Sequence, residues 1–562
     1  MSQIWKIQSK ITGTSLTKRR QQIINSLLKS RGLTTKTQQK EFFNPLKPQD
    51  ISLKQVAIKP AQITKAIKRI TQAIKDNHPI FIYGDYDADG ICSTAILWET
   101  LHYLNANVLP YIPTRADKTR GLSQQGIDAI IKQSKNQLSQ NILIITVDNG
   151  ISSFKGCDYA KKKNIDVIIT DHHQPKHKGN KSLLPKALAI IHSTELAGVG
   201  VAWIFAQQIL KITKLAPRHP LPATLELAAL GTIADMVPLI KANRSLAKFG
   251  ITQLQQTRRP GLQILAKISN IDIKKINSHQ ISFSLAPRIN ALGRLDHAID
   301  ALRLLCTTDE LRAKELADNL YQVNKTRQDL TQTALAHAKN QWLKQDQSQK
   351  LIFVSHHSYH EGIVGLVAGR LAEKFNKPAV VIAQGKTHSK GSVRSIKGFN
   401  IIANLRALEK HILELGGHEL AAGFTIENKK MAIIQKKLQA MAKKQLNKKP
   451  TQPELNIDCQ IDLADINQEL FNQLEKFQPF GFNNQMPTFA TKQAKLTTFR
   501  AVGQTQKHLK LKIDNLDAIA FSFGDLASEL SIDKPIDIVY TIEENHWNGR
   551  TTLQLKMIDI NY

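Results

Sequence analysis

The chain has 562 residues, of which 77 are lysine or arginine and 46 are aspartate or glutamate, so its formal net charge is +31. This length exceeds what one hydrophobic core usually supports, and we expect several domains. The four cysteines lie far apart with no Cys-x-x-Cys pair, which argues against a disulfide framework and against a structural zinc site.

Charge and hydropathy indicate the kind of partner. A basic excess of this size attracts polyanions, because neutralised phosphates release their counterions, so nucleic acid is the leading candidate. A basic surface that serves solubility or an anionic membrane stays open as an alternative. The sequence contains no run of about 18 apolar residues, and residues 1–20 lack the apolar stretch of a signal peptide. We therefore expect a cytoplasmic protein without a membrane partner.

The predicted elements divide the chain into five segments. Residues 1–60 form a helical extension, with a helical apolar pattern over 14–43. Over residues 61–240 strands and helices alternate, which is typical of an α/β domain with a doubly wound parallel sheet. Residues 241–345 are helical and include a stretch from Thr308 to Lys344 without glycine or proline. That stretch predicts one long helix that connects two domains.

The last two segments change character again. Residues 346–449 form a second α/β unit, with strands at 351–354 and 379–383 on either side of a helix at 363–375. Residues 450–562 alternate short strands with turns, which favours a small β-barrel of the oligonucleotide-binding (OB) type. Four aromatic residues near its start line either a single-strand binding surface or the core, namely Phe477, Phe480, Phe482 and Phe489.

Three aspartates directly follow the first strand of the first α/β segment. The apolar run 80–82 leads into Tyr83-Gly-Asp-Tyr-Asp-Ala-Asp-Gly90, which brings Asp85, Asp87 and Asp89 close together. Carboxylates at this spacing repel one another unless a cation neutralises them. The motif therefore predicts a metal site.

Two later strands end in the same way. Residues 141–147 run apolar into Asp148-Asn-Gly150, and residues 165–170 run into Asp171-His172-His173. Each run predicts a buried strand that ends in metal-ligating side chains. Because the carboxyl ends of parallel strands face one crevice, we expect these acids and imidazoles to converge.

Other interpretations of single motifs compete with the metal site. An Asp-x-Asp-Gly turn needs no metal, and this stays open for the first motif alone. An EF-hand loop that began at Asp85 would need glutamate where the chain has Ile96. The third glycine of a dinucleotide fingerprint that began at Gly198 falls at Trp203, so a close-packed helix entrance is favoured there. A second metal among the histidines and glutamate of residues 356–361 also stays open, although their order matches no zinc-protease motif.

Ordered motifs along the chain carry a family resemblance. The first four are Asp85-Tyr-Asp-Ala-Asp-Gly90, Thr146-Val-Asp-Asn-Gly150, Thr170-Asp-His-His173 and Gly231-Thr-Ile-Ala-Asp-Met-Val-Pro238. In this order they resemble the DHH phosphoesterase superfamily. The likeness continues through Ala286-Pro-Arg-Ile-Asn-Ala-Leu-Gly-Arg294, His360-Glu-Gly-Ile-Val-Gly365, Gly391-Ser-Val-Arg-Ser395 and Gly416-Gly-His418. It covers nearly the whole length, and within the superfamily it is closest to bacterial exonucleases specific for single-stranded DNA.

The resemblance implies a site for two divalent metal ions, Mn²⁺ or Mg²⁺, which carboxylate and imidazole ligands suit. The implied ligands are Asp85, Asp87, Asp89, Asp148, His172 and Asp235, with Asp148 between the two ions. By the same likeness, a hydroxide held by the ions attacks phosphorus in line, and His173 contacts the scissile phosphate. The implied catalytic residues are then Asp87, Asp89, Asp148, His172, His173 and Asp235.

The resemblance also implies a nucleotide-binding group on the helical region and the second α/β unit. Its expected members are Arg288, Asn290, Arg294, His360, Ser392, Arg394 and Ser395. Arginine suits this role because its guanidinium group matches phosphate oxygens bidentately. For each arginine alone, a salt bridge between domains remains an alternative.

The chain departs from the family pattern in three places. Tyr83 stands where many relatives have histidine, which puts one outer contact of the first acidic motif in doubt. Only residues 193–195 precede Leu196, where relatives usually have a longer loop, so the rim of the pocket is expected to differ. In the last segment Gly481-Phe-Asn-Asn-Gln485 replaces Gly-x-Gly-Asn-Pro, which puts the geometry of that turn in doubt.

The resemblance implies a monomeric, metal-dependent exonuclease that degrades single-stranded DNA from its 5′ end to mononucleotides in recombination and repair. A single-strand-binding protein and a RecQ-type helicase are then the expected protein partners. One rival is a phosphodiesterase for short oligoribonucleotides or cyclic dinucleotides, against which the C-terminal barrel and the basic excess argue. A second rival is a catalytically silent single-strand-binding scaffold, against which the intact metal motifs argue.

Overall fold

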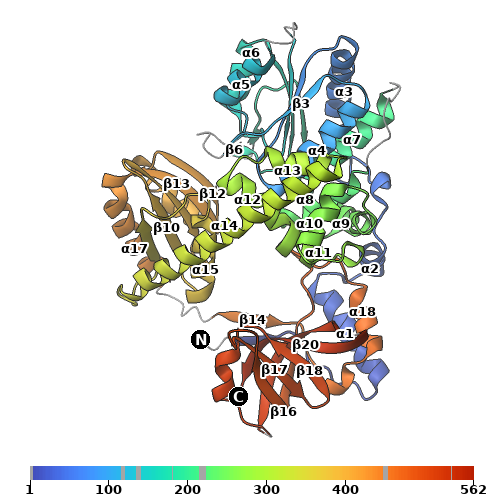
Figure 1. Ribbon diagram of the computed structural model, residues 1–562, viewed down its shortest axis with the longest axis vertical. Coiled ribbons are helices and arrows are strands. Elements are labelled where there is room, and N and C mark those ends of the chain that lie inside the picture. Colours follow the sequence, from blue (N-terminus) through green and yellow to red (C-terminus); the bar gives the residue numbers. More distant parts are fainter. Residues whose placement is uncertain are drawn as a thin grey trace.

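The computed structural model describes residues 4–114, 121–134, 141–179, 181–213, 223–446, 453–532, 534–547 and 549–562. In Figure 1 the first α/β unit lies at the top, a helical region lies below it, the second α/β unit lies to the left, and a barrel lies at the bottom. Among the described residues, no helix is long and apolar enough to cross a membrane.

The first α/β unit is a parallel sheet of five strands in the order β3-β2-β4-β5-β8. The strands are β2 (Ile80–Tyr83), β3 (Val108–Tyr111), β4 (Leu143–Val147), β5 (Asp166–Asp171) and β8 (Ala189–His192). One face is covered by α3 (Pro60–Lys75), α4 (Ala88–Tyr103) and α7 (Gly198–Ile212), and the other by α5 (Gln124–Ser134) and α6 (Phe154–Lys162) (Figure 1). This arrangement confirms the doubly wound sheet. Because the chain passes from β2 to β3 on one side and then to β4 on the other, a crevice is expected at the carboxyl ends of β2 and β4.

The helical region packs under this sheet and contains the predicted long helix. Its elements are α8 (Leu225–Ala234), α9 (Lys241–Leu254), α10 (Pro260–Ile268), α11 (Ser278–Gln280), the π-turn η3 (Ile281–Leu285), α12 (Ala286–Leu295), α13 (Ile299–Cys306) and α14 (Glu310–Leu343). The long helix is α14, and the side chain of Asp309 caps its first turn by accepting from the N–H of Arg312. Ala334, Ala338 and Trp342 of α14 share a core with the second α/β unit, so this helix belongs to both.

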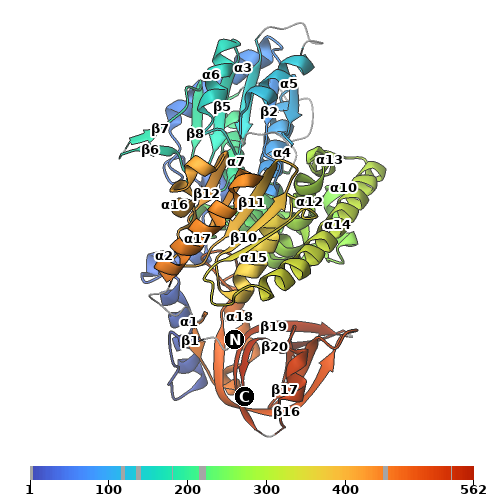
Figure 2. The ribbon, with the colours of Figure 1, turned by 90° about the vertical axis from the view of Figure 1, so that its left-hand side faces the viewer.

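The second α/β unit is a mixed sheet of five strands in the order β12-β13-β11-β10-β9. The strands are β9 (Ile352–His356), β10 (Ala379–Gln384), β11 (His388–Arg394), β12 (Glu414–His418) and β13 (Ala421–Glu427). The helix α15 (Val364–Phe375) packs on one face together with α14, and α16 (Ile401–Arg406) and α17 (Met431–Leu446) pack on the other (Figure 2). The predicted end of this unit at residues 449–450 lies outside the described residues.

The C-terminal strands close into a barrel of the predicted OB-like kind. The strands β16 (Phe489–Val502), β17 (His508–Ile513), β18 (Leu516–Ala520), β20 (Arg550–Asn561) and β19 (Pro535–Trp547) pair in this order, and β19 pairs back with β16. Phe477 and Phe489 are fully buried in its core, whereas the Phe482 side chain is 51% exposed. The four phenylalanines therefore do not form one binding surface.

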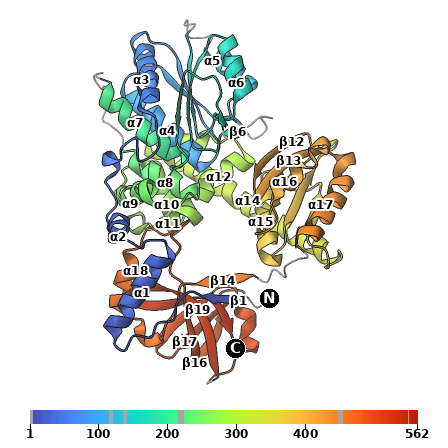
Figure 3. The same ribbon diagram turned by 180° about the vertical axis from the view of Figure 1, so that it is seen from behind.

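The N-terminal segment packs against the barrel rather than standing apart. Its strand β1 (Ile4–Ile7) pairs in parallel with β14 (Glu454–Ile457). Its helices α1 (Leu16–Ser30) and α2 (Lys36–Phe43) contribute to the barrel's hydrophobic core, as does α18 (Gln468–Glu475). Figure 3 shows α1 and α18 side by side at the edge of the barrel. The two ends of the described chain thus form one structural unit.

Candidate active site

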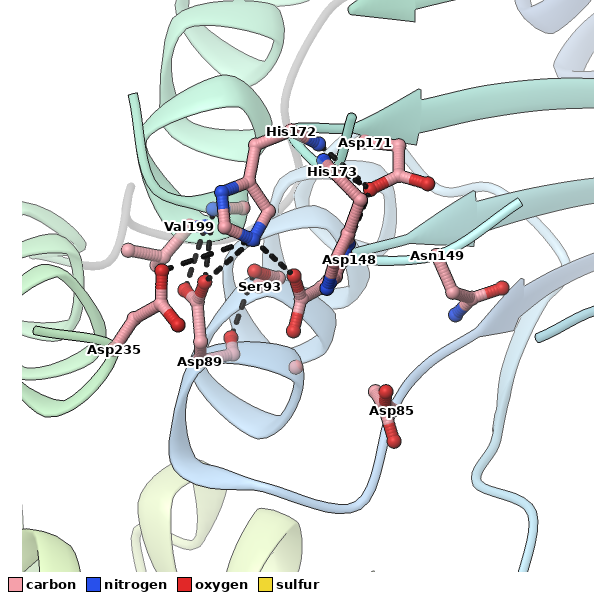
Figure 4. Close-up of polar contacts among 12 residues, drawn as sticks. Asp85, Asp89, Ser93, Asp148, Asn149, Asp171, His172, His173, Val199 and Asp235 are labelled. Carbon is pink, nitrogen blue, oxygen red and sulfur yellow. Dashed lines mark hydrogen bonds and ion pairs between the residues drawn. The ribbon is translucent and has the colours of Figure 1, made fainter. Parts of the chain in front are cut away.

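Acids and an imidazole from four elements converge at the carboxyl end of the parallel sheet (Figure 4). Asp148 follows β4, His172 follows β5, Asp89 lies in the first turn of α4, and Asp235 ends α8. His172 Nε2 lies 3.2 Å from Asp148 Oδ1, 3.7 Å from Asp235 Oδ2 and 3.9 Å from Asp89 Oδ2. The expected convergence of the strand ends is therefore present in the fold.

The donor atoms of this cluster fit a divalent metal ion. Two overlapping groups, Asp148 with His172 and His173, and Asp89 with His172 and Asp235, each place their donor atoms within 4.8 Å of one another. Asp148 Oδ1, His172 Nε2 and Asp235 Oδ2 are buried and have no hydrogen-bond partner within the protein. Such atoms are costly to bury unless something coordinates them. Carboxylate oxygen and imidazole nitrogen are ligands that suit Mn²⁺ and, for the oxygens, Mg²⁺.

The pKa shifts of these groups follow from their burial and from their mutual charges, and they also fit a metal site. Burial, followed by the charges of neighbouring aspartates, raises the pKa of Asp89 and of Asp148 well above its usual range. Burial and the charge of Asp87 raise the pKa of Asp235 to about 7. Burial lowers the pKa of His172 to about 4, so this imidazole is neutral near pH 7, as a metal ligand must be. A bound cation would favour the charged form of all three carboxylates.

The N-terminus of α7 holds Asp89 in place. Its carboxylate accepts hydrogen bonds from the backbone N–H of Gly198 (2.8 Å) and of Val199 (2.7 Å), two amides at a helix end that favours negative charge. A Cβ atom on Gly198 would lie 2.4 Å from Asp148 Oδ1, so only glycine allows the helix to approach both acids. This close packing agrees with the helix entrance predicted at Gly198 and was not foreseen as part of the metal site.

Asp171 begins the Asp-His-His motif and was expected among the converging acids, but in the structure it belongs to neither tight donor group. The Asp171 side chain is 1% exposed and turns away from the metal cluster. It accepts hydrogen bonds from the backbone N–H of Ile151 (2.8 Å), His172 (2.7 Å) and His173 (3.0 Å). It also contacts His173 Nδ1 at 2.8 Å.

The pairing of Asp171 with His173 sets the charge on that imidazole. Burial opposes the charge on His173, but the hydrogen bond and charge of Asp171 outweigh it and raise the pKa of His173 to about 9. For Asp171, burial is likewise outweighed by His173, and its pKa is lowered. His173 is therefore cationic near pH 7 and partly exposed beside the cluster, which suits contact with a phosphate.

Asp85 and Asp87 lie at the edge of the cluster. Asp87 caps α4 by accepting from the N–H of Gly90 at 3.1 Å. Asp85 accepts from the N–H of Tyr86 at 2.7 Å and stands apart from the other acids in Figure 4. The charges of both still raise the pKa of Asp148. Among the described residues neither belongs to the two tight donor groups, so their role as ligands remains a prediction.

The Tyr83 side chain packs in a core of the first α/β unit. Its hydroxyl donates to the carbonyl of Gly121 at 3.1 Å, and its ring packs on Tyr111. The end of β2 is instead tied to the end of β4 by Asn149, whose side-chain amide donates to the carbonyls of Tyr83 (3.2 Å) and Val147 (2.8 Å). Tyr83 is therefore part of the packing behind the end of β2.

The helix α12 connects the acidic loop to the second α/β unit. Asn290 Oδ1 accepts from the N–H of Ala88 at 2.7 Å, next to Asp87. Arg294 Nη1 donates to the carbonyl of Gly362 at 3.2 Å, in the loop that also carries His360. Asn290 and Arg294 thus lie at the junction between the two units, whereas Arg288 Nη1 donates to the carbonyl of Ser284 at 2.7 Å.

The other predicted nucleotide-binding residues lie on β11, directly after it, and in the loop before α15. Arg394 Nη1 donates to Ser392 Oγ at 3.2 Å, and both face Gly365 of α15. Ser395 Oγ donates to the carbonyl of Phe399 at 2.6 Å, and His360 Nδ1 accepts from a backbone N–H in its own loop at 3.0 Å. The histidines and glutamate of residues 356–361 form no metal-type group in the described part of the chain.

Comparison with known proteins decides the family. Family models match at residues 79–232 (DHH family, N-terminal domain), 348–445 (DHHA1 domain) and 457–559 (RecJ OB domain). The single-stranded-DNA-specific exonuclease RecJ of Bacillus subtilis is 35% identical over 561 residues, which cover 96% of this chain and 67% of that protein. RecJ of Salmonella typhimurium is 32% identical, with 89% of this chain and 90% of that protein covered. The chain belongs to the RecJ family.

Solved RecJ structures agree with this assignment. The crystal structure of RecJ from Thermus thermophilus in complex with Mn²⁺ matches with a TM-score of 0.79 and 27% identity, over 100% of this chain and 79% of that chain. The same protein in complex with Mg²⁺ matches with a TM-score of 0.73. The predicted metals are thus the ones present in those RecJ crystals. The number of ions in this RecJ-family chain stays a prediction.

Proposed function

We propose that this RecJ-family protein is an exonuclease that hydrolyses single-stranded DNA from its 5′ end and releases mononucleotides. The observation that carries the proposal is the buried cluster of Asp148, His172 and Asp235, whose donor atoms have no partner within the protein. The names of its relatives, which are exonucleases specific for single-stranded DNA, supply the substrate and the type of reaction. The net charge of +31 supports a polyanionic substrate.

The proposed site holds two divalent ions, Mn²⁺ or Mg²⁺, through Asp85, Asp87, Asp89, Asp148, His172 and Asp235. Ions bound there supply positive charge that activates water and offsets the charge that develops on the phosphoryl and leaving oxygens. The cationic His173, oriented by Asp171, binds a non-bridging oxygen of the scissile phosphate. Water adds to phosphorus, the bond from phosphorus to the 3′ oxygen breaks, and that oxygen takes up a proton.

The second α/β unit and α12 position the nucleotide that is released. We assign this role to His360, Ser392, Arg394 and Ser395, with Arg288, Asn290 and Arg294 on the neighbouring phosphates. In support, Arg394 and Ser392 contact each other on β11, and α12 reaches both the acidic loop and the loop that carries His360. The five predicted segments then act as an N-terminal extension, a catalytic domain, a connecting region, a nucleotide-binding domain and a strand-binding barrel.

In the cell we expect the protein to act as a monomer in the cytoplasm, during recombination and repair. A single-strand-binding protein and a RecQ-type helicase are the proposed partners, because one covers and the other produces single strands.

The test is an end-label assay with purified full-length protein and Mn²⁺. Single-stranded DNA labelled at the 5′ or at the 3′ end is compared with duplex DNA, RNA and very short oligoribonucleotides. Early release of labelled mononucleotide from the 5′-labelled single strand alone is the expected result. Preference for short RNA would indicate the phosphodiesterase instead, and tight binding without cleavage would indicate a silent scaffold. Asp148→Asn is the matched control, and it should bind strands without cleaving them.

A further inference from the structure

Two short backbone segments adjoin the predicted metal ligands. The first is residues 193–197, which connect β8 to α7 and are called the β8–α7 loop below. The second is residues 236–240, which connect α8 to α9 and are called the α8–α9 segment. Asp235 directly precedes the second segment. The spacing of the donor atoms therefore depends on how these two segments are held relative to each other.

The β8–α7 loop and the first turn after it contact two of the predicted ligands. Burial lowers the pKa of His172, and a hydrogen bond from its ring to the backbone of Leu196 opposes this shift. A metal-bound imidazole commonly uses its second ring nitrogen in this way, which fixes the orientation of the ring. Directly after the loop, the N–H groups of Gly198 and Val199 donate to Asp89. A displacement of the loop would therefore move both His172 and Asp89.

The α8–α9 segment has a backbone that needs support from outside. Met236 at its start has φ of 59°, and Lys241 directly after it has φ of 46°. Residues with a side chain rarely adopt this left-handed conformation, and it persists where surrounding contacts enforce it. One such contact is the hydrogen bond from the N–H of Leu239 to the carbonyl of Phe482, at 2.9 Å. The position of Asp235 thus depends on contacts that the residues after it make.

Asn243 joins the two segments. It is the third residue of α9, and its side chain is 4% exposed. Its Nδ2 donates to the carbonyl of Glu195 at 3.1 Å and to the carbonyl of Pro238 at 3.2 Å. Glu195 immediately precedes Leu196 in the loop, and Pro238 lies three residues after Asp235. One amide group therefore connects the backbone that contacts His172 to the backbone that follows Asp235.

Packing alone does not explain an asparagine at this position. Its Oδ1 is buried and has no hydrogen-bond partner within the protein. A buried polar atom without a partner destabilises the folded state, and an apolar residue of similar size would avoid this cost. The two hydrogen bonds of Nδ2 are thus the contribution that asparagine makes here. Because only residues 193–195 lie between β8 and Leu196, the loop has little freedom to compensate for a lost anchor.

We propose that Asn243 is a positioning residue of the metal site, which fixes the distance between the β8–α7 loop and the α8–α9 segment. Through the loop it positions Asp89 and His172, and through the segment it positions Asp235. The inference rests on the proposed function, because it concerns the metal site of that reaction. It predicts that loss of the two hydrogen bonds lowers the affinity for metal and leaves the binding of single strands unchanged.

The test is calorimetric titration of the full-length protein with Mn²⁺. Asn243→Leu keeps the size and branching of the side chain but removes both hydrogen bonds, and it should lower Mn²⁺ affinity by about 10- to 100-fold. Asn243→Ser keeps one hydroxyl donor and should show a smaller loss. Ser245→Ala is the matched control, because Ser245 is buried on the same helix and donates to the carbonyl of Leu46, outside both segments. It should lower the melting temperature and leave Mn²⁺ affinity unchanged.

Strand binding and cleavage separate a positioning role from a structural one. Anisotropy with metal-free protein should give Asn243→Leu the wild-type affinity for an oligothymidylate. In cleavage assays, the Mn²⁺ concentration for half-maximal rate should rise by the same factor as the loss of Mn²⁺ affinity, whereas KM for the strand at saturating Mn²⁺ should not change.

Two results would overturn the role of Asn243. One is a wild-type Mn²⁺ affinity in Asn243→Leu or, if that variant does not fold, in Asn243→Ser. The other is an equal loss of Mn²⁺ affinity in Ser245→Ala, which would indicate that any loosening of α9 has this effect. A wild-type protein that binds Mn²⁺ but cleaves no strand would contradict the proposed function, and a loss of Mn²⁺ affinity confined to the Asn243 variants would then still support the positioning role.

Discussion

Replacement of Arg259 tests how the helices that carry the acidic cluster are held together. Its guanidinium group donates to both oxygens of Glu99 on α4, at 2.5 and 2.6 Å, and to Glu226 Oε1 on α8 at 2.7 Å. Asp89 lies on the first of these helices, and Asp235 ends the second. The Glu99 side chain is 8% exposed and Glu226 is fully buried. Arg259 is thus the only cation that pairs with either carboxylate among the described residues.

The loss of stability expected for Arg259→Met follows from the two buried carboxylates that remain without a partner. Removal of one partner from a buried ion pair costs about 3–5 kcal/mol, because an uncompensated charge stays buried. At about 2–4 °C for each kcal/mol in a unit of this size, the melting temperature of the first α/β unit should fall by about 6–20 °C. The triple variant Arg259→Met/Glu99→Gln/Glu226→Gln should recover part of this loss, since no charge remains unpaired.

The assay is calorimetric unfolding of the full chain at several pH values. Burial raises the pKa of Glu226 even with Arg259 in place. A carboxyl group whose folded pKa lies above its unfolded value stabilises the fold at low pH and loses that contribution as pH rises through the folded pKa. The loss of stability of Arg259→Met relative to the wild-type protein should therefore be larger at pH 8 than at pH 5. If Arg259→Met lowered the free energy of unfolding by less than about 1 kcal/mol, or if the triple variant were less stable than Arg259→Met, the reasoning would be refuted.

Other predictions concern the metal and the substrate. Asp148→Ala should abolish cleavage with little change in strand affinity by anisotropy, and near-normal turnover would contradict its role. Gly198→Ala places a Cβ 2.4 Å from Asp148 Oδ1 and should lower Mn²⁺ affinity by about 10- to 100-fold in calorimetric titration. Gly200→Ala, whose Cβ meets only side chains at 3.2 Å or more, is the control. Removal of metal by a chelator should stop cleavage, and Mn²⁺ at 100 times its Kd should restore about 2.7 kcal/mol of stability in the same calorimeter. Arg394→Ala should raise KM on single strands with Mn²⁺ affinity unchanged, and unaltered kinetics would remove it from the site.

Much of the fold could be predicted because its signals are local. The strands β2 and β4 are buried on both faces, so they appear in the sequence as short, continuous apolar runs. The helix α14 appears as a long stretch without glycine or proline. The positions of Asp148 and His172 follow from the ends of such strands, since parallel strands carry their carboxyl ends to one edge of the sheet.

The different structural positions of the three neighbouring aspartates could not be predicted from their spacing. The helix α4 begins at Ala88, so Asp87 becomes its capping residue and Asp89 enters its first turn. Asp89 then meets the N-terminus of α7, a contact with residues more than a hundred positions away. The same limit applies to Asp171, because nothing in an Asp-His-His sequence says which of the three side chains turns toward the metal.

The packing of the N-terminal segment on the barrel is also a long-range feature. The helical pattern of residues 14–43 correctly predicts α1 and α2, but a pattern of apolar positions does not say what covers them. In the structure, Ile23 and Leu27 lie in one core with residues of the C-terminal strands. For the same reason, the sequence left open whether the four phenylalanines line a binding surface or the core. In the structure, Phe477 and Phe489 are buried in the barrel core.

A buried arginine fixes the barrel to the catalytic region. Arg244 on α9 is 1% exposed, and its guanidinium group lies 3.7 Å from the ring centroid of Phe42. It donates to the carbonyls of Phe42 and Gln478, each at 2.7 Å, and burial lowers its pKa to about 10. These acceptors belong to the N-terminal segment and to the segment before the barrel. Rotation of the barrel would leave a buried cation without acceptors, which is costly.

The same stretch of chain carries a predicted metal ligand. Asp235 ends α8, and four residues later the N–H of Leu239 donates to the carbonyl of Phe482 at 2.9 Å, in the segment that leads into the barrel. The acidic cluster and the barrel are therefore joined through a short, hydrogen-bonded connection. Under the proposed function, a strand held on the barrel would reach the acidic cluster over a fixed path.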